Sequence, residues 1–266
     1  MTTLTGIVLT KNEENNIEKC LNSIKWCDEI IIVDDYSVDR TLEKIQISKS
    51  KFQIKSQIQI FKKKLNDDFA EQRNFGMEKA SGEWVIFVDA DEKVTRKLQN
   101  EISQVVLNRG RNDICSYYIK RRDYFWGREL KYGETKKLRD RGIVRLVKKN
   151  SGKWVGKVHE EFQANCKTGK LNGFLDHYPH QTIREFINEV NFYSSLRARE
   201  LLDNGKKTNV FEIIFFPLCK FIYTYFIKFG FLDGPAGFTY AFFMSFHSFL
   251  VRTKLYQYTN YTRKSS

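Results

Sequence analysis

The chain has 266 residues, enough to bury one large core or one domain with an appendage. A composition of 41% hydrophobic residues with only three prolines excludes a disordered chain. The five cysteines are scattered and form no CxxC pair, so we expect neither a disulfide framework nor a zinc site, and a reducing compartment. Because no basic region with a long apolar core opens the sequence, we expect no secretory signal and a cytosol-facing protein.

The net charge of +13 is unevenly distributed along the chain. Between Lys120 and Lys153, thirteen Lys or Arg residues stand against four Asp or Glu residues, which supplies +9 of the total. Such a basic patch attracts an anionic partner, for example nucleic acid, a phosphorylated sugar or anionic lipid headgroups. The alternative is a solvated basic face with no partner.

Strand-like and helix-like segments alternate over the first hundred residues. The apolar runs that predict strands occupy residues 4–10, 29–35, 56–61 and 83–89. Helical patterns follow these runs and begin near residues 12, 41, 70 and 95. We expect Ser37 or Asp39 to cap the second helix and Thr95 to begin the fourth. This alternation predicts βαβ units, and therefore an α/β fold with a mainly parallel sheet.

The next part of the chain is less regular. From about residue 110 to 180 the sequence predicts shorter strands and loops, which we expect to close the open side of the sheet where a second substrate would bind. Residues 182–207 then show a clear helical pattern.

The C-terminal tail contains two apolar and aromatic segments, at 210–231 and 235–251. The second is opened by a Pro and a Gly and is short for a bilayer span of about 20 residues. Helices rich in Tyr and Phe and flanked by Lys and Arg often lie in the membrane interface. We favour such interfacial helices, while ordinary core helices and a hairpin inserted in the bilayer remain open alternatives.

Two carboxylates follow the fourth predicted strand, in the stretch EWVIFVDADEKVT. Asp89 and Asp91 are two residues apart, so they leave the strand on the same face and repel each other unless a cation lies between them. Two oxygen ligands suit Mg²⁺ or Mn²⁺, which also bind a diphosphate. A solvated helix cap is the alternative for this D-x-D pattern.

Other polar residues fall near the same predicted edge. Asp34 and Asp35 end the second strand, where a carboxylate can accept hydrogen bonds from a nucleotide base or a ribose hydroxyl, or can form a turn that leads into the next helix. Arg73 and Asn74, on the helix before the D-x-D strand, could approach the same cleft. Ligands of parallel sheets bind at the carboxyl ends of strands, which is where these residues are expected.

A resemblance to a known family connects these segments. In order, spacing and strand context, IVLTKNEENNIEKCLNSI, IIIVDDYSVDRT and QRNFGMEKASGEWVIFVDADE resemble the GT-A catalytic domain of family 2 glycosyltransferases. The segments VHEEF, DHYPHQTIREFINEVNFYS and GFLDGPAGF resemble a narrower group, the bacterial lipopolysaccharide core glycosyltransferases of the β-1,4-glucosyltransferase type. The resemblance implies a GT-A fold in residues 1–181, with a nucleotide-sugar half (1–108) and an acceptor half (109–181), followed by a helical, membrane-associating region at 182–266.

The resemblance also implies site residues. Those expected to bind the nucleotide-sugar are Thr10, Asn12, Asp34, Asp35, Arg73 and Asp89. Those expected to bind Mg²⁺ or Mn²⁺ are Asp91, Asp89 and His159, with Asp91 favoured as the direct ligand. His177 and His180 flank Tyr178-Pro179 and are interpreted as a structural turn.

An inverting family 2 enzyme needs one carboxylate to take a proton from the acceptor hydroxyl. The resemblance places this role at His159-Glu160-Glu161, and we favour Glu160, with Glu161 and Asp123 as alternatives. Many family members carry a Glu-Asp pair for this role, and none occurs after residue 108.

The implied function is inverting transfer of a glucose-like hexose from a nucleotide-diphosphate sugar, most often a UDP-sugar. The implied acceptor is a lipopolysaccharide core or another lipid-linked glycan, bound by the aromatic and basic segment YYIKRRDYFWGRELKYG, with the tail on the inner leaflet of the bacterial inner membrane. Alternatives are a capsule glycosyltransferase, a nucleotidyltransferase, a membrane-binding scaffold and a nucleic-acid-binding protein. The last is disfavoured because acidic strand ends repel phosphates unless a metal is bound.

Overall fold

The computed structural model describes residues 3–51, 57–108, 113–157, 160–179 and 182–261. The chain forms two compact units. The first consists of Met1–Arg122 with Leu138–Tyr178, and the second of Asp123–Lys137 with Pro179–Ser266. Residues 123–137, which the sequence analysis grouped with the acceptor half, therefore belong to the same unit as the C-terminal helices.

The first unit is built on a mixed sheet whose strand order is β3-β2-β1-β4-β8-β6-β11-β5. Its parallel half consists of β1 (Leu4–Thr10), β2 (Glu29–Asp34), β3 (Gln57–Lys62) and β4 (Trp84–Asp89), as the sequence predicts. Its other half consists of β8 (Ile143–Lys148), β6 (Ile114–Phe125), β11 (Lys167–His177) and β5 (Glu92–Val94). In this half β8 is antiparallel to both β4 and β6, and β5 to β11, so these strands extend the sheet beyond β4.

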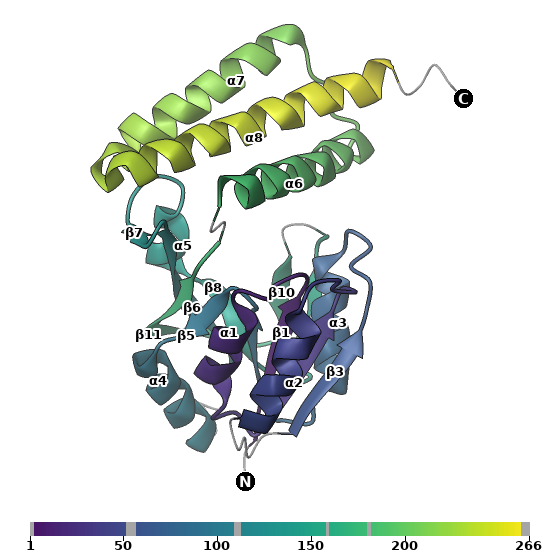
Figure 1. Ribbon diagram of the computed structural model, residues 1–266, viewed down its shortest axis with the longest axis vertical. Helices are drawn as coiled ribbons and strands as arrows, with labels where there is room; N and C mark the ends of the chain where they lie inside the picture. Colours follow the sequence, from purple (N-terminus) through teal and green to yellow (C-terminus); the bar gives the residue numbers. More distant parts are fainter. Residues whose placement is uncertain (1–2, 52–56, 109–112, 158–159, 180–181, 262–266) are drawn as a thin grey trace. The chain divides into compact units, whose positions relative to one another are not determined.

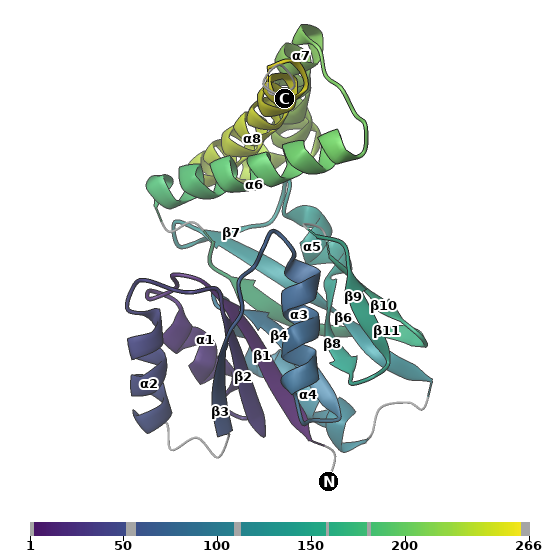
Figure 2. The same ribbon diagram turned by 90° about the vertical axis from the view of Figure 1, so that its right-hand side faces the viewer.

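Both faces of the parallel half are covered, which is why its strands read as continuous apolar runs. One face packs against α1 (Ile17–Ile24), α2 (Thr41–Lys51) and α4 (Arg96–Leu107). The other face packs against α3 (Phe69–Lys79) and a hairpin of β9 (Gly152–Val155) and β10 (Glu161–Ala164). Figures 1 and 2 show α1 and α2 on one side of the strands and α3 on the other.

Two predicted caps are confirmed. The carboxylate of Asp39 accepts hydrogen bonds from the backbone N–H and the hydroxyl of Thr41, at 3.0 and 2.6 Å, where α2 begins. The Thr95 hydroxyl accepts from the N–H of Leu98 in the first turn of α4. Such caps satisfy N–H groups that have no partner within the helix.

The second unit contains the C-terminal helices and a short strand, β7 (Arg128–Leu130), paired with the end of β6. The helices are α6 (Ile183–Asp203), α7 (Val210–Ile222), a π-helical turn (Tyr223–Ile227), a 3₁₀ turn (Gly230–Asp233) and α8 (Gly234–Asn260). A capping box of Thr182 and Glu185 begins α6. The core of this unit joins Phe125 and Leu130 to Phe186 on α6 and Phe243 on α8.

A membrane-length apolar stretch lies in this second unit. Val210–Ile227 has a mean hydropathy of 1.7, and only 11% of its residues are buried. Among the described residues it is the one helix long and apolar enough to cross a membrane, by length and composition alone.

The cysteines depart from the sequence prediction. Cys115 on β6 and Cys166 in the turn before β11 form a disulfide, with their Cα atoms 5.9 Å apart. The prediction of no disulfide rested on spacing in the sequence, and this pair is 51 residues apart, so only strand pairing brings it together. Cys20 and Cys27 are buried and not part of a disulfide, and Cys219 on α7 is exposed.

Candidate active site

The parallel half of the sheet brings three predicted site residues to one edge. In the strand register, Thr10 on β1 pairs with Asp34 on β2, and Leu9 pairs with Asp89 on β4. All three polar residues are therefore at the carboxyl ends of adjacent parallel strands, where α/β sheets bind their ligands.

The two loops that follow β1 and β2 hold each other in place. The N–H of Asn12 donates to the Ser37 hydroxyl, and the side-chain oxygen of Asn12 accepts from the N–H of Val38, both at 2.9 Å. Asp34 accepts from the N–H of Ser37, which is the turn that the sequence analysis considered for one of the two aspartates. Asp35 binds the Lys11 ammonium at 2.6 Å. These residues shape the rim of the site through protein contacts of their own.

Asp89, the first D-x-D aspartate, lies between two arginines. Arg73 Nη2 is 3.1 Å from its Oδ1 atom, and Arg145 Nη1 is 3.3 Å from the same atom. Burial alone would raise the pKa of the Asp89 carboxyl, but Arg145 and Arg73 outweigh it and hold that pKa well below its usual value. The negative charge of Asp89, which would otherwise repel that of Asp91, is thus balanced by these two arginines.

Arg145 is a site residue that the sequence analysis missed. The pairing of β6 with β8 shifts register between Tyr117, which pairs with Leu146, and Tyr118, which pairs with Val144. Arg145 is the extra residue of this bulge, and bulges re-aim side chains next to active sites. Its guanidinium is buried and also binds Glu92 at 3.3 Å. An arginine within the apolar run IVRLV was the available clue in the sequence.

Asp91, the second D-x-D aspartate, faces a different partner. His177, the last residue of β11, places its Nε2 atom 3.0 Å from Asp91 Oδ2. Burial opposes ionisation of Asp91, but the imidazole outweighs it, so the pKa of the carboxyl lies below its usual value. The sequence predicts a structural turn at His177, whereas the strand register of β11 with β5 brings this residue to the site.

The metal expected from the sequence can be tested against these side chains. The Asp91 carboxylate is a ligand that suits Mg²⁺ or Mn²⁺, and the imidazole of His177, 3.0 Å away, adds a nitrogen ligand that suits Mn²⁺ better than Mg²⁺. Among the described residues no group of three or more His, Cys, Asp or Glu side chains could hold a metal. From the described residues, the protein would supply two ligands, with water and substrate oxygens supplying others. His159, the other predicted ligand, lies outside the described residues.

Of the three candidate bases, Glu160 is the one in contact with this network. Its Oε1 atom accepts from Arg73 Nε at 2.9 Å, so Arg73 joins Glu160 to Asp89. Glu161 is exposed at the start of β10, and Asp123 is buried in the second unit. The structure thus brings Glu160 to the D-x-D motif although the two are about 70 residues apart in the sequence.

Several buried polar atoms at this edge lack a partner within the part of the chain that is described, among them Thr10 Oγ1 and Arg73 Nη1. Thr10 is 5% exposed and Arg73 is 3% exposed. An unsatisfied buried donor is costly, so such atoms in a folded protein need an explanation, and a bound ligand is one. Both residues are among those predicted to bind the nucleotide-sugar.

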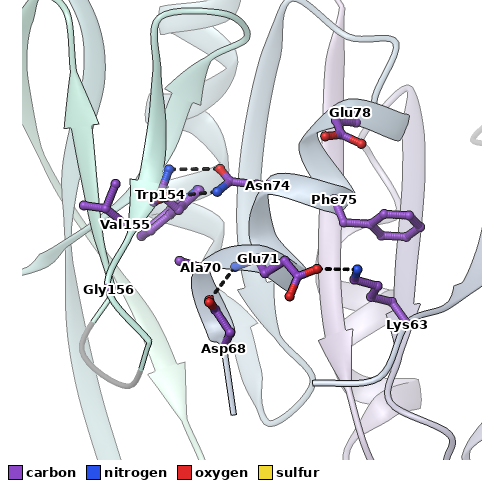
Figure 3. A pocket seen from close by; sticks show the side chains of 10 residues that line it. All are labelled: Lys63, Asp68, Ala70, Glu71, Asn74, Phe75, Glu78, Trp154, Val155 and Gly156. Atoms are coloured by element: carbon purple, nitrogen blue, oxygen red, sulfur yellow. Dashed lines mark hydrogen bonds and ion pairs between the residues drawn. The ribbon is translucent and has the colours of Figure 1, made fainter. Parts of the chain in front are cut away.

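A separate pocket of about 410 Å³ lies on the outer side of α3, against β9 (Figure 3). Its lining contains none of the predicted nucleotide, metal or base residues. Asn74, which was expected to approach the catalytic cleft, lies here instead. Its side-chain amide donates to the carbonyl of Trp154 and accepts from the N–H of Trp154, both at 2.9 Å (Figure 3). Asn74 therefore joins α3 to β9.

This fold is of the GT-A type. The chain belongs to glycosyl transferase family 2, whose sequence model matches residues 5–155. It is a glycosyltransferase.

Individual relatives are similar over nearly the whole chain. The lipopolysaccharide core biosynthesis glycosyltransferase LpsC of Rhizobium meliloti (strain 1021) is 29% identical over 96% of this chain and 92% of its own length. An uncharacterized glycosyltransferase of Rickettsia typhi is 26% identical over 96% of this chain and 87% of its own. Among solved structures, the mannosyltransferase PcManGT from Pyrobaculum calidifontis, in complex with GDP-Man and Mn²⁺, has a TM-score of 0.51 at 14% identity. It covers 93% of this chain and 74% of its own, and this likeness concerns the fold alone.

Proposed function

We propose that this glycosyltransferase moves a glucose-like hexose from a UDP-sugar, with inversion, to a lipopolysaccharide core or another lipid-linked glycan. The similarity to LpsC over most of both chains supports this acceptor class. The observation that carries the proposal is the arrangement at the end of β4, where Arg73 joins Asp89 to Glu160 and His177 meets Asp91.

The donor would be held by the side chains that the protein leaves unsatisfied. Thr10 Oγ1 and Arg73 Nη1 are buried donors without a protein partner among the described residues. Oxygens of the nucleotide-sugar would accept hydrogen bonds from them. Asn12, Asp34 and Asp35 would form the rim for the base and ribose, since their loops are fixed by hydrogen bonds to each other.

Asp91 and His177 would hold Mg²⁺ or Mn²⁺, which when bound neutralises charge on the leaving diphosphate. We assign this role to them rather than to Asp89, because Asp89 is already paired with two arginines. Glu160 would take the proton of the acceptor hydroxyl, as a single displacement with inversion requires.

The C-terminal helices would place the enzyme on the cytoplasmic face of the inner membrane, where a lipid-linked acceptor is found. The support for this location is the run of exposed aromatic and aliphatic residues on α7 and the start of α8.

The first test is nucleotide binding, measured by thermal shift with a panel of UDP- and GDP-sugars with and without Mn²⁺. We expect a Mn²⁺-dependent rise in melting temperature with UDP-sugars, because a ligand that binds only the folded state stabilises it. Asp91→Ala and His177→Ala should abolish this rise and transfer while the proteins remain folded. Unchanged Mn²⁺-dependent binding in both variants would remove the metal role from these residues.

A further inference from the structure

The helices α7 and α8 form an antiparallel hairpin with one strongly apolar outer side. Ser245 on α8 donates to the carbonyl of Pro217 on α7, and the ring of Phe238 packs against Phe221, which fixes the two helices side by side. The exposed residues of this outer side, here called the apolar face, are Phe211, Phe215, Leu218, Ile222, Phe226, Phe238, Phe242 and Phe249. On each helix they are spaced three, four or seven residues apart, so they form one stripe.

The size of this face calls for a partner. Each of the residues in the apolar face is at least 39% exposed. Soluble proteins rarely expose contiguous apolar patches of this extent. An 18-residue stretch such as Val210–Ile227 would be about 27 Å long as a helix, close to the roughly 30 Å of a bilayer core. A lipid bilayer therefore fits the face, and the hairpin could either cross it or lie in its surface.

The tip of the hairpin is the segment between α7 and α8, which includes the turns Tyr223–Ile227 and Gly230–Asp233. Its contacts decide between these two arrangements. The buried carboxylate of Asp233 accepts hydrogen bonds from the backbone N–H groups of Lys131 and Tyr132, at 3.0 and 2.9 Å. The N–H of Gly133 donates to the carbonyl of Lys228 at 3.0 Å. The tip is thus bound to the loop that follows β7, within the same unit.

That loop cannot enter the bilayer core. It carries Lys131 and Glu134, and it continues from the short β6–β7 ladder, whose open edge would leave backbone groups unsatisfied in lipid. A hairpin that crossed the membrane would have to carry the loop and the ladder through it, or break the contacts of Asp233.

Helix α6 gives a second, independent constraint. It packs along α8, with Phe186 stacked on Phe243. At the other end of the contact, Lys254 on α8 donates to Asn191 and Ser194 of α6. Because α6 also carries charged residues at several positions, α8 has a polar neighbour along much of its length. Helix α6 therefore limits the part of the α8 surface that lipid can reach.

The charges of the hairpin indicate the kind of lipid. Residues 210–260 contain four Lys or Arg and two Asp or Glu, and one of the acidic residues is the buried Asp233. Of the basic residues, Lys220 pairs with Glu134 at 2.9 Å. Arg252 lies over the ring of Phe216 at 4.3 Å, and Lys228 over the ring of Tyr223 at 4.9 Å. Cations beside exposed aromatic rings are typical of helices at an anionic membrane interface.

We infer that the α7–α8 hairpin is a monotopic anchor: it lies in one leaflet of an anionic bilayer with the apolar face inserted, and its tip and both ends stay on the same aqueous side. This inference rests on the membrane location in the proposed function, and it adds the orientation of the hairpin and the lipid charge.

Cys219 provides a native probe, because it is exposed on α7 between Leu218 and Ile222 of the apolar face. The full-length protein is mixed with sealed vesicles of phosphatidylcholine containing phosphatidylglycerol, and a charged maleimide is added outside. We expect Cys219 to react in solution and to be protected on vesicles. In a Cys219→Ser background, Lys131→Cys at the tip and Lys207→Cys at the start of the hairpin should both react on vesicles.

The outcomes separate this inference from the location itself. The experiment is repeated with vesicles of phosphatidylcholine alone. If the protein binds neither these nor the vesicles with phosphatidylglycerol, both the membrane location and the anchor are overturned. Binding with Lys131→Cys protected overturns the in-plane arrangement and leaves the location intact. Equal binding to vesicles of phosphatidylcholine alone overturns the role of anionic lipid.

A matched pair of variants tests the apolar face directly. Phe215→Glu should lower the vesicle-bound fraction about tenfold or more, because it places a charge in the inserted surface. Leu107→Glu, at a residue 79% exposed in the first unit, should leave binding unchanged. In both variants UDP-sugar binding by thermal shift should match the unmodified protein, and equal membrane binding by the two variants would contradict the inference.

Discussion

Around the end of β4, the ionised side chains that we have named each contact a partner of opposite charge. Arg73 lies between Asp89 and Glu160, Arg145 lies between Asp89 and Glu92, and His177 meets Asp91. Removing one member therefore leaves a charge in a low-dielectric site without its partner, which costs more than the contact itself contributes.

Glu160 can act on the acceptor or can only hold Arg73, and kinetics distinguish the two roles. If Glu160 is the base, the substitution Glu160→Gln should lower kcat by about 10²–10⁴ with little change in donor affinity. If Glu160 only positions Arg73, the KM for the donor should rise instead. Glu161→Gln, at an exposed position next to it, is the control and should behave as the unmodified enzyme.

Arg145 should be among the most sensitive residues of the site. Burial lowers the pKa of its guanidinium, but Asp89 and Glu92 outweigh burial and raise that pKa, so the arginine stays charged. We expect Arg145→Ala to reduce the free energy of unfolding by about 3–5 kcal/mol, measured in urea.

A control for Arg145 comes from an exposed pair. Arg40→Ala removes a surface contact with Glu43 and should leave the free energy of unfolding nearly unchanged. If Arg145→Ala does not fold, Arg145→Met combined with Glu92→Gln removes both charges and should recover stability. Equal losses for Arg145→Ala and Arg40→Ala would show that the buried network contributes nothing.

At the scale of elements, the β9–β10 hairpin depends on α3. Asn74 satisfies both backbone groups of Trp154, a residue that packs against Phe87 and lies under the Arg73 guanidinium. Since Glu160 directly precedes β10, the helix and the hairpin together set the distance between Arg73 and Glu160.

Asn74→Ala should therefore loosen the hairpin. Two buried backbone groups lose their partner, and we expect a loss of about 2–3 kcal/mol in the free energy of unfolding, with faster hydrogen exchange at the N–H of Trp154. Glu78→Ala changes an exposed residue of the same helix and should alter neither quantity. An unchanged exchange rate in Asn74→Ala would show that other contacts hold the hairpin.

At the scale of the whole molecule, the reactivity of the five cysteines tests the fold at several points along the chain. Burial raises the pKa of the Cys20 and Cys27 thiols, so both should be unreactive in the folded protein. We expect one reactive thiol in the native protein, Cys219, and none after Cys219→Ser. Reduction of the Cys115–Cys166 disulfide should lower the free energy of unfolding by about 2–4 kcal/mol, because the bond restricts the unfolded chain. Reaction of Cys115 or Cys166 before reduction would contradict the disulfide.

The sequence by itself determined the parallel half of the sheet. The strands at 4–10 and 83–89, the caps at Asp39 and Thr95, and the D-x-D motif at a strand end all follow from patterns of fewer than about twenty residues, which local propensity and periodicity encode. The tail was also visible as an apolar, aromatic segment, since composition alone shows it.

Only the tertiary structure decided which distant residues meet. Arg145 reaches Asp89 across 56 residues through a bulge, His177 reaches Asp91 through the pairing of β11 with β5, and Asn74 turned out to bind Trp154 rather than face the cleft. The bond between Cys115 and Cys166 and the grouping of residues 123–137 with the C-terminal helices have the same origin. The physical reason is that strand register and packing bring together residues far apart in the chain, and no local pattern in a single sequence records that register.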